Sequence, residues 1–279
     1  MRRAAALCTL LSLSWLLQAK EAKLKPEELV EKHLAAIGAP EARAEVKSRM
    51  MNGTAEVVFR VGSFGRLTGG STFASQGNRL RLALKFPHPE YPGEQLAFDG
   101  EDVSVGVIHS GRRSELSQFV HEYDSLLKEG LLGGATSTAW CLLDMKSRQP
   151  RLNYSGLKKF EGRELHELRY RPRKGLGDFV ITLYFEPDTF RHVYTTYVLK
   201  IASYMGATPE ESARQRDVFY RIREEFGDFR TVDGLTLPHS YKLALTYEGQ
   251  NQTRLTQWTV AFEEVRHNPE LDPSIFAVR

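Results

Sequence analysis

Apolar and polar residues alternate along most of the chain after Met50, with the period of two that is typical of β-strands with one buried face. The alternation is clearest in residues 78–86, where one face carries Leu80, Leu82, Leu84 and Phe86. Similar segments follow at 103–107, 179–185, 193–201, 241–247 and 258–262. The turns predicted between strands include Asp99-Gly100, Glu186-Pro187-Asp188 and Asp233-Gly234. Because no strand–helix–strand repeat is visible, we predict a mainly β fold (α+β) with one antiparallel sheet of about ten strands.

Two segments before the sheet have helical spacing. In residues 26–37 one helical stripe carries Leu29, Val30, His33, Leu34 and Ile37. Pro26 suits the first turn of this helix, and Gly38 suits its C-terminal cap. A second short helical stretch is predicted from Pro40 through Val46.

The β pattern is interrupted once, by residues 114–132, which we name the lid. Apolar residues recur there at helical spacing, namely Leu116, Phe119, Val120, Tyr123, Leu126 and Leu127. Ser114 is a suitable N-cap, and Gly130 or the Gly133-Gly134 pair would end the helix. We predict an amphipathic helix that stands alone among strands.

A long antiparallel sheet twists and curls, so its concave face must be covered. Both faces of residues 179–185 are apolar, and one of them carries Phe179, Ile181, Leu183 and Phe185. We expect these four side chains to lie opposite the six apolar side chains of the lid. If side chains fill the space between them, it is an ordinary core; if the space is partly open, it is an apolar pocket closed by a movable helix.

The N-terminus is typical of a secretory signal peptide. Arg2 and Arg3 precede a mostly apolar run that ends near Ala19, which is short for a transmembrane span. We predict that residues 1–19 are removed and that residues 20–279 form a single domain. The alternative is a retained N-terminal anchor. Lipidation at Cys8 is rejected, because Leu7 precedes it where a small residue is expected.

Charge and cysteine content exclude several classes of protein. Without Arg2 and Arg3 the net charge falls from +3 to +1, so there is no basic face for nucleic acid. Cys141 is the one cysteine left after cleavage, which precludes an internal disulfide. We interpret Cys141, next to Trp140, as a small buried apolar residue.

Motifs for catalysis are missing from the sequence. There is no GxSxG, no Walker loop, no HExxH and no paired-cysteine site, and the eight histidines have no ligand spacing. A metal site at His121, Glu122 and Asp124 is disfavoured, because a helix points these side chains to different sides. We therefore expect no metal, no cofactor and no enzymatic activity.

Several short segments resemble the LolA/LolB-like superfamily, specifically periplasmic carriers of the outer-membrane lipoprotein-sorting type. They are Ala35-Ala36-Ile37-Gly38, Val46-Lys47-Ser48-Arg49, Met51-Asn52-Gly53-Thr54, Ala97-Phe98-Asp99-Gly100, Tyr184-Phe185-Glu186-Pro187-Asp188-Thr189-Phe190-Arg191, Gly234-Leu235-Thr236-Leu237-Pro238-His239 and Asn268 to Phe276. The resemblance implies an incomplete, strongly curved barrel whose hollow is covered by helices. This chain departs from the carriers by added loops at 172–177 and 206–216.

Two functions remain open from the sequence. The resemblance implies a periplasmic carrier of a lipid or a lipoprotein acyl chain. We expect a monomer whose ligand is lined by the ten apolar residues of the lid and of 179–185. The alternative is a non-catalytic scaffold with a fully packed half-barrel, acting with an envelope protein as its partner.

Overall fold

The computed structural model describes residues 24–60, 65–108, 111–174, 176–203, 216–249 and 252–278. The predicted signal peptide of residues 1–19 and most of the predicted loop at 206–216 lie outside these residues. Both therefore stay predictions.

The described residues form one sheet of twelve strands, slightly more than the ten expected. The strands are β1 Ser48–Phe59, β2 Arg66–Gln76, β3 Arg79–Lys85, β4 Gly93–Phe98, β5 Val103–Val105, β6 Arg151–Phe160, β7 Arg163–Arg171, β8 Val180–Phe185, β9 His192–Ile201, β10 Val218–Val232, β11 Leu235–Glu248 and β12 Thr253–His267. Their spatial order is β5-β4-β3-β2-β1-β12-β11-β10-β9-β8-β7-β6. All neighbours are antiparallel. Since β5 and β6 do not pair with each other, the sheet is an open, incomplete barrel, which confirms the predicted fold class.

Short helices complete the described fold. They are α1 Pro26–Ile37, α2 Pro40–Glu45, α3 Glu115–Glu122, α4 Ser125–Lys128 and α5 Met145–Arg148, with 3-10 turns η1 Gly134–Thr136, η2 Cys141–Asp144 and η3 Pro273–Phe276. The prediction for the N-terminal helix is confirmed, and the N–H of its cap Gly38 donates to the carbonyl of Leu34.

The lid contains two helices instead of the single one predicted. Ser114 caps α3 as expected, since its hydroxyl accepts a hydrogen bond from the N–H of Ser117. The backbone then leaves the helical region at Tyr123 (φ −119°, ψ 52°), and α4 starts after Asp124. This break lets Leu126 and Leu127 reach the sheet from a new direction, and both are fully buried.

Gly130, the first of the two predicted stops, ends the helical part of the lid for a reason of close packing. Its φ is +67°, and a Cβ at this position would lie 1.9 Å from the carbonyl oxygen of Ala139. Glycine is thus required both for the left-handed backbone and for the approach of the chain that follows.

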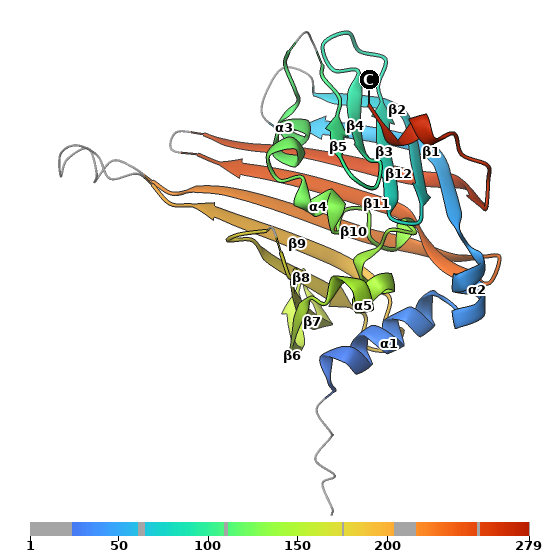
Figure 1. Ribbon diagram of the computed structural model, residues 1–279. Coiled ribbons are helices and arrows are strands. Elements are labelled where there is room, and N and C mark those ends of the chain that lie inside the picture. Colours follow the sequence, from blue (N-terminus) through green and yellow to red (C-terminus); the bar gives the residue numbers. More distant parts are fainter. Residues whose placement is uncertain are drawn as a thin grey trace, which may run out of the picture.

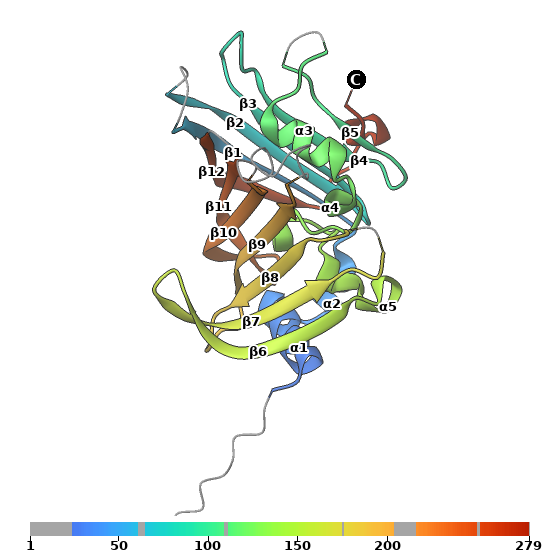
Figure 2. The same ribbon diagram turned by 90° about the vertical axis from the view of Figure 1, so that its left-hand side faces the viewer.

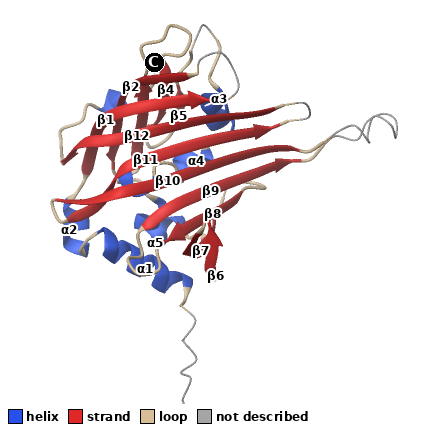
Figure 3. Cartoon of the chain, turned by 180° about the vertical axis from the view of Figure 1, so that it is seen from behind, coloured by secondary structure: helices blue, strands red, loops and turns tan. Residues whose placement is uncertain are grey.

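The sheet curls around the lid helices. Figure 1 shows the long strands β9 to β12 crossing the molecule, with α3, α4 and α5 on one side of them. In Figure 2, β1 to β3 and β6 to β8 form two flanks of the curl, and the lid lies within it. Seen from behind, in Figure 3, the strands stand in front of α3 and α4, so the lid occupies the concave face. The main hydrophobic core lies between this face and the lid.

Candidate functional site

The apolar side of the lid packs against the concave face of the sheet. Leu116, Phe119 and Val120 of α3 are at most 2% exposed. The ring of Phe119 lies 5.9 Å from that of Phe179 and 5.2 Å from that of Tyr220, between ring centroids. Tyr123 lies 5.2 Å from Phe179 in a T-shaped contact. The lid and the residue preceding β8 therefore meet through aromatic rings.

The structure brings all ten predicted lining residues together. Eight of them belong to one buried cluster, while Tyr123 and Phe179 are partly buried and pack against it. The two apolar faces of β8 serve different purposes: Ile181, Leu183 and Phe185 face the hollow, whereas Tyr184 packs in a second cluster with Leu165 and other residues. Side chains fill the space between the lid and β8 in this closed arrangement.

The hollow is covered by the lid and by a second segment that the sequence reasoning missed; we call the two together the cover. Residues 133–142, which we name the plug, follow the lid into the hollow as 3-10 turns and loops. Ala139, Trp140, Cys141 and Leu142 of the plug are at most 3% exposed. The available signal was the run of small and apolar residues between Leu131 and Leu142, which has neither strand nor helix period.

Side chains alone fasten this cover to the sheet. Among the described residues, the backbone–backbone hydrogen bonds of residues 114–149 all stay within that segment. Because no sheet ladder includes it, the cover can move without breaking a strand pair. Three buried charged residues make the principal contacts.

The first is Glu94 on β4, under the start of the lid. It accepts hydrogen bonds from the hydroxyls of Ser114 (2.6 Å) and Ser117 (2.8 Å) and from Tyr91 (2.5 Å). Tyr91 in turn accepts a hydrogen bond from the indole N–H of Trp258 at 2.8 Å. Burial raises the pKa of the Glu94 carboxyl, although the three donors oppose the shift. This residue fixes the N-terminus of α3.

The second is Glu224 on β10, under the end of the lid. Its carboxylate accepts hydrogen bonds from the backbone N–H of Gly133 (2.7 Å) and from the hydroxyls of Tyr197 (2.6 Å) and Tyr241 (2.7 Å). Burial raises the pKa of Glu224 to about 7, against the effect of these three donors. The junction of lid and plug is therefore held by a group that titrates near neutral pH.

The third is Arg49 on β1, which is 5% exposed. Its Nη1 donates to the carbonyl oxygen of Ala135 at 2.8 Å, two residues beyond the contact of Glu224 with Gly133. One acidic and one basic side chain from different strands thus hold the two sides of η1.

Two buried histidines contact Trp140 of the plug, namely His33 on α1 and His192 on β9. The indole N–H of Trp140 donates to Nε2 of His33 at 3.1 Å, and Nδ1 of His33 lies 3.1 Å from the carbonyl oxygen of Phe190. Since indole only donates, His33 must carry its proton on Nδ1. Burial lowers the pKa of His33 to about 4, and that of His192, stacked on Trp140, well below its usual value. These imidazoles serve as neutral packing and hydrogen-bonding groups.

The described residues give little support for a metal site, a nucleophilic cysteine or a membrane-spanning helix. They contain no group of three or more side chains that could hold a metal ion. Cys141 is fully buried, and burial raises the pKa of its thiol, which disfavours a nucleophilic thiolate. No helix in the described part of the chain has the length and apolar character needed to cross a membrane.

No protein-family model and no curated protein matches the sequence. Among solved structures, the chain is similar to a LolA superfamily protein from Nitrosomonas europaea, with 13% identity, coverage of 91% of this chain and 97% of that one, and a TM-score of 0.47. A DUF1329 family protein from Desulfovibrio piger shares 11% identity over 90% and 96% of the two chains, with a TM-score of 0.47. A putative outer membrane lipoprotein-sorting protein domain from Vibrio parahaemolyticus shares 13% identity over 88% and 97%, with a TM-score of 0.41. In structure, then, this chain is similar to a LolA superfamily protein and to a putative lipoprotein-sorting protein domain.

Proposed function

We propose that this protein is a periplasmic, non-enzymatic carrier that binds the acyl chain of a lipid or a lipoprotein between its lid and its curved sheet. Residues 20–279 act as one domain after removal of the signal peptide. The ligand chain lies where the apolar side of the lid now packs, against Phe179, Ile181, Leu183 and Phe185.

The supporting observation is that the cover is attached to the sheet by side chains alone. α3 has eight residues and α4 has four, so both are too short to be stable without packing. When the lid leaves the sheet, the twelve-stranded ladder stays intact and its apolar concave face becomes available.

The energies of the two states are comparable. The five fully buried lid side chains (Leu116, Phe119, Val120, Leu126 and Leu127) contribute together about 10 kcal/mol, at roughly 2 kcal/mol each. An acyl chain gains about 0.8 kcal/mol per buried methylene, so about twelve methylenes offset the loss of the lid contacts. A single long acyl chain can therefore displace the lid, and release of the chain lets the lid return.

Binding of an apolar fluorescent probe such as 1-N-phenylnaphthylamine tests the proposal, together with native mass spectrometry of protein purified from the periplasm. We expect co-purified lipid and probe binding by the wild-type protein. In the bound state the lid covers the chain, so Phe119→Asp puts a charge on the covering side of the lid and should abolish probe binding.

The matched control is Phe160→Asp. Phe160 is partly buried, and its ring stacks on that of Tyr184 with 4.1 Å between the centroids. It packs against the second cluster, away from the lid. This variant should still bind the probe. If Phe119→Asp binds the probe as well as Phe160→Asp does, the hollow is not the site.

The contiguous burial of the lid favours one competing function, a packed scaffold that acts with an envelope protein. A wild-type protein that carries no lipid and binds no probe would support the scaffold and refute the carrier.

A further inference from the structure

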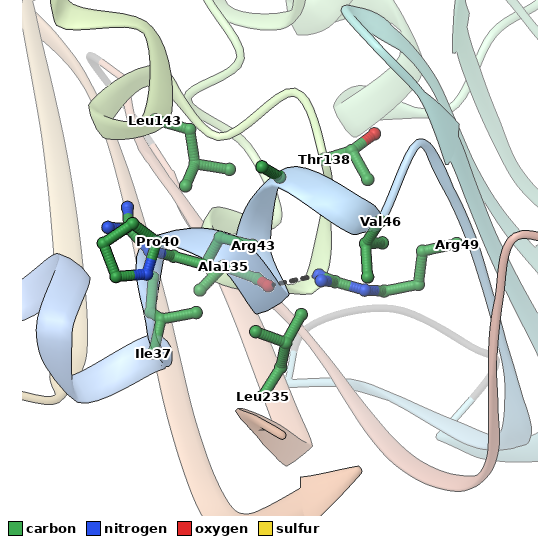
Figure 4. Close-up of a pocket in the computed structure, with 10 residues that line it drawn as sticks. Ile37, Pro40, Arg43, Val46, Arg49, Ala135, Thr138, Leu143 and Leu235 are labelled. Atoms are coloured by element: carbon green, nitrogen blue, oxygen red, sulfur yellow. Dashed lines mark hydrogen bonds between the residues drawn. The ribbon is translucent and has the colours of Figure 1, made fainter. Parts of the chain in front are cut away.

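A cavity of about 360 Å³ lies outside the hollow, between α1, α2, β1 and the plug. Figure 4 shows the side chain of Arg49 entering it between Val46 and Leu235, with its guanidinium directed towards Ala135. The volume is within the range of small-molecule sites. We name it the Arg49 cavity.

The lining combines positive charge with apolar surface. Arg43 and Arg49 both contribute to it, and none of its ten lining residues is acidic. The apolar part includes Ile37, Val46 and Leu235. Such a lining suits a molecule with an anionic end and an aliphatic end.

The guanidinium of Arg49 has hydrogen-bonding capacity to spare. Its Nη1 donates to Ala135, but its buried Nε has no hydrogen-bond partner in the described structure. Leaving a buried charged donor unpaired is unfavourable. A guanidinium group pairs favourably with a carboxylate.

Among the described residues, no acidic side chain forms an ion pair with Arg49. Burial is the cause that lowers its pKa, to about 10, with no acidic side chain acting in the opposite direction. Its cross-strand neighbour His267 is affected by the same charge: after burial, Arg49 is the next cause that lowers the pKa of that imidazole. Asp233 lies 3.0 Å from His267, at the histidine's Nδ1.

We propose that the Arg49 cavity is a second ligand site, which takes a small amphiphilic monocarboxylate. The guanidinium groups of Arg49 and Arg43 attract the carboxylate, and the apolar lining holds the aliphatic part. The site is separate from the hollow under the lid and does not depend on the proposed carrier function.

Titration of ¹⁵N-labelled protein with hexanoate and, separately, with 1-hexanol tests this by NMR. A charge-assisted contact should make hexanoate bind the wild-type protein at least about tenfold more tightly than hexanol. The shifted amides should be those of residues 37–49 and Ala135. Equal affinities for the two probes, or shifts confined to other regions, would overturn the proposal without any variant.

Variants then assign the preference to a residue. Arg49→Met should remove the preference for hexanoate and leave hexanol binding unchanged. Arg81→Met is the matched control, because Arg81 also donates to backbone carbonyls, those of Ile275 and Ala277, on the outer face of the sheet; it should keep the preference. Phe119→Asp should keep it too, which separates this site from the hollow. A preference that survives Arg49→Met refutes the assignment.

Discussion

Replacing Glu224 by glutamine should remove a pH dependence of stability that this carboxyl group gives the wild-type protein. Glu224 is 0% exposed and receives three hydrogen bonds, one of them from Gly133 at the junction of lid and plug. Glutamine keeps the size and one acceptor oxygen of this side chain but does not titrate.

The sign follows from the direction of the shift. The pKa of Glu224 rises from 4.5 to about 7 on folding, so the native state binds the proton more tightly than the unfolded state. The stability from this group is fully present below the unfolded pKa and is lost as the pH rises through the folded pKa. At 1.36 kcal/mol per pKa unit, the loss between about pH 4 and pH 8 is about 3 kcal/mol.

Urea unfolding of the wild-type protein and of Glu224→Gln at several pH values measures this effect. His33 and His192 titrate in both proteins, so they cancel in the difference between the two unfolding free energies. We expect Glu224→Gln to gain about 3 kcal/mol relative to the wild type between pH 4.5 and pH 8. Glu225→Gln is the control on the same strand, because Glu225 is part-buried and pairs with Lys242 at 2.9 Å. A difference between wild type and Glu224→Gln that stays constant with pH refutes the reasoning.

Three further substitutions test the cover and the core. Glu94→Ala removes the acceptor of the Ser114 and Ser117 hydroxyls, so hydrogen exchange over α3 should accelerate while exchange in the sheet stays slow. Equal protection of α3 in both proteins would contradict a tether at this residue. Gly130→Ala should lower the Tm strongly, because the new Cβ would clash with the carbonyl oxygen of Ala139. Its control is Gly162→Ala, at a similar φ but with no atom within 4 Å of the new Cβ, which should cost only about 1–2 kcal/mol of backbone strain. Leu183→Ala should destabilise the protein by about 2–5 kcal/mol in urea unfolding, because Leu183 is fully buried. Val180, on the same strand, is half exposed, so Val180→Ala should cost well under about 1 kcal/mol. Similar values for the two variants would mean that the hollow is not packed.

Local periodicity was sufficient for much of the fold. The helix at residues 26–37, the cap at Ser114 and the hairpin at Asp233-Gly234 follow from neighbouring residues alone, and the structure has all three. The plug could not be predicted in this way. Its conformation depends on contacts with residues far along the chain, such as His33 and Glu224, and its sequence has no regular period.

The buried charged residues had a signal that the sequence reasoning did not use. On β4, Glu94 alternates with Leu96 and Phe98, and on β10, Glu224 lies between Ile222 and Phe226 at spacings of two. Since side chains two apart in a strand share a face, each carboxylate is placed on the apolar side of its strand. A charged residue in register with apolar ones thus marks a position where the sheet binds another part of the chain.

Burying carboxylates beneath a lid carries a desolvation penalty, and this penalty is consistent with a lid that opens. An apolar contact of similar volume would hold the closed state more tightly, because burying an ionisable group carries a desolvation penalty. When the lid departs, Glu94 and Glu224 regain water and recover that penalty, so each hydrogen bond to Ser114 or Gly133 adds little net stability to the closed state. The same bonds are directional, since a carboxylate accepts only from donors in the right place. The carboxylate contacts therefore make closure specific in its geometry while adding little to its strength, which is what the proposed opening of the lid for an acyl chain requires.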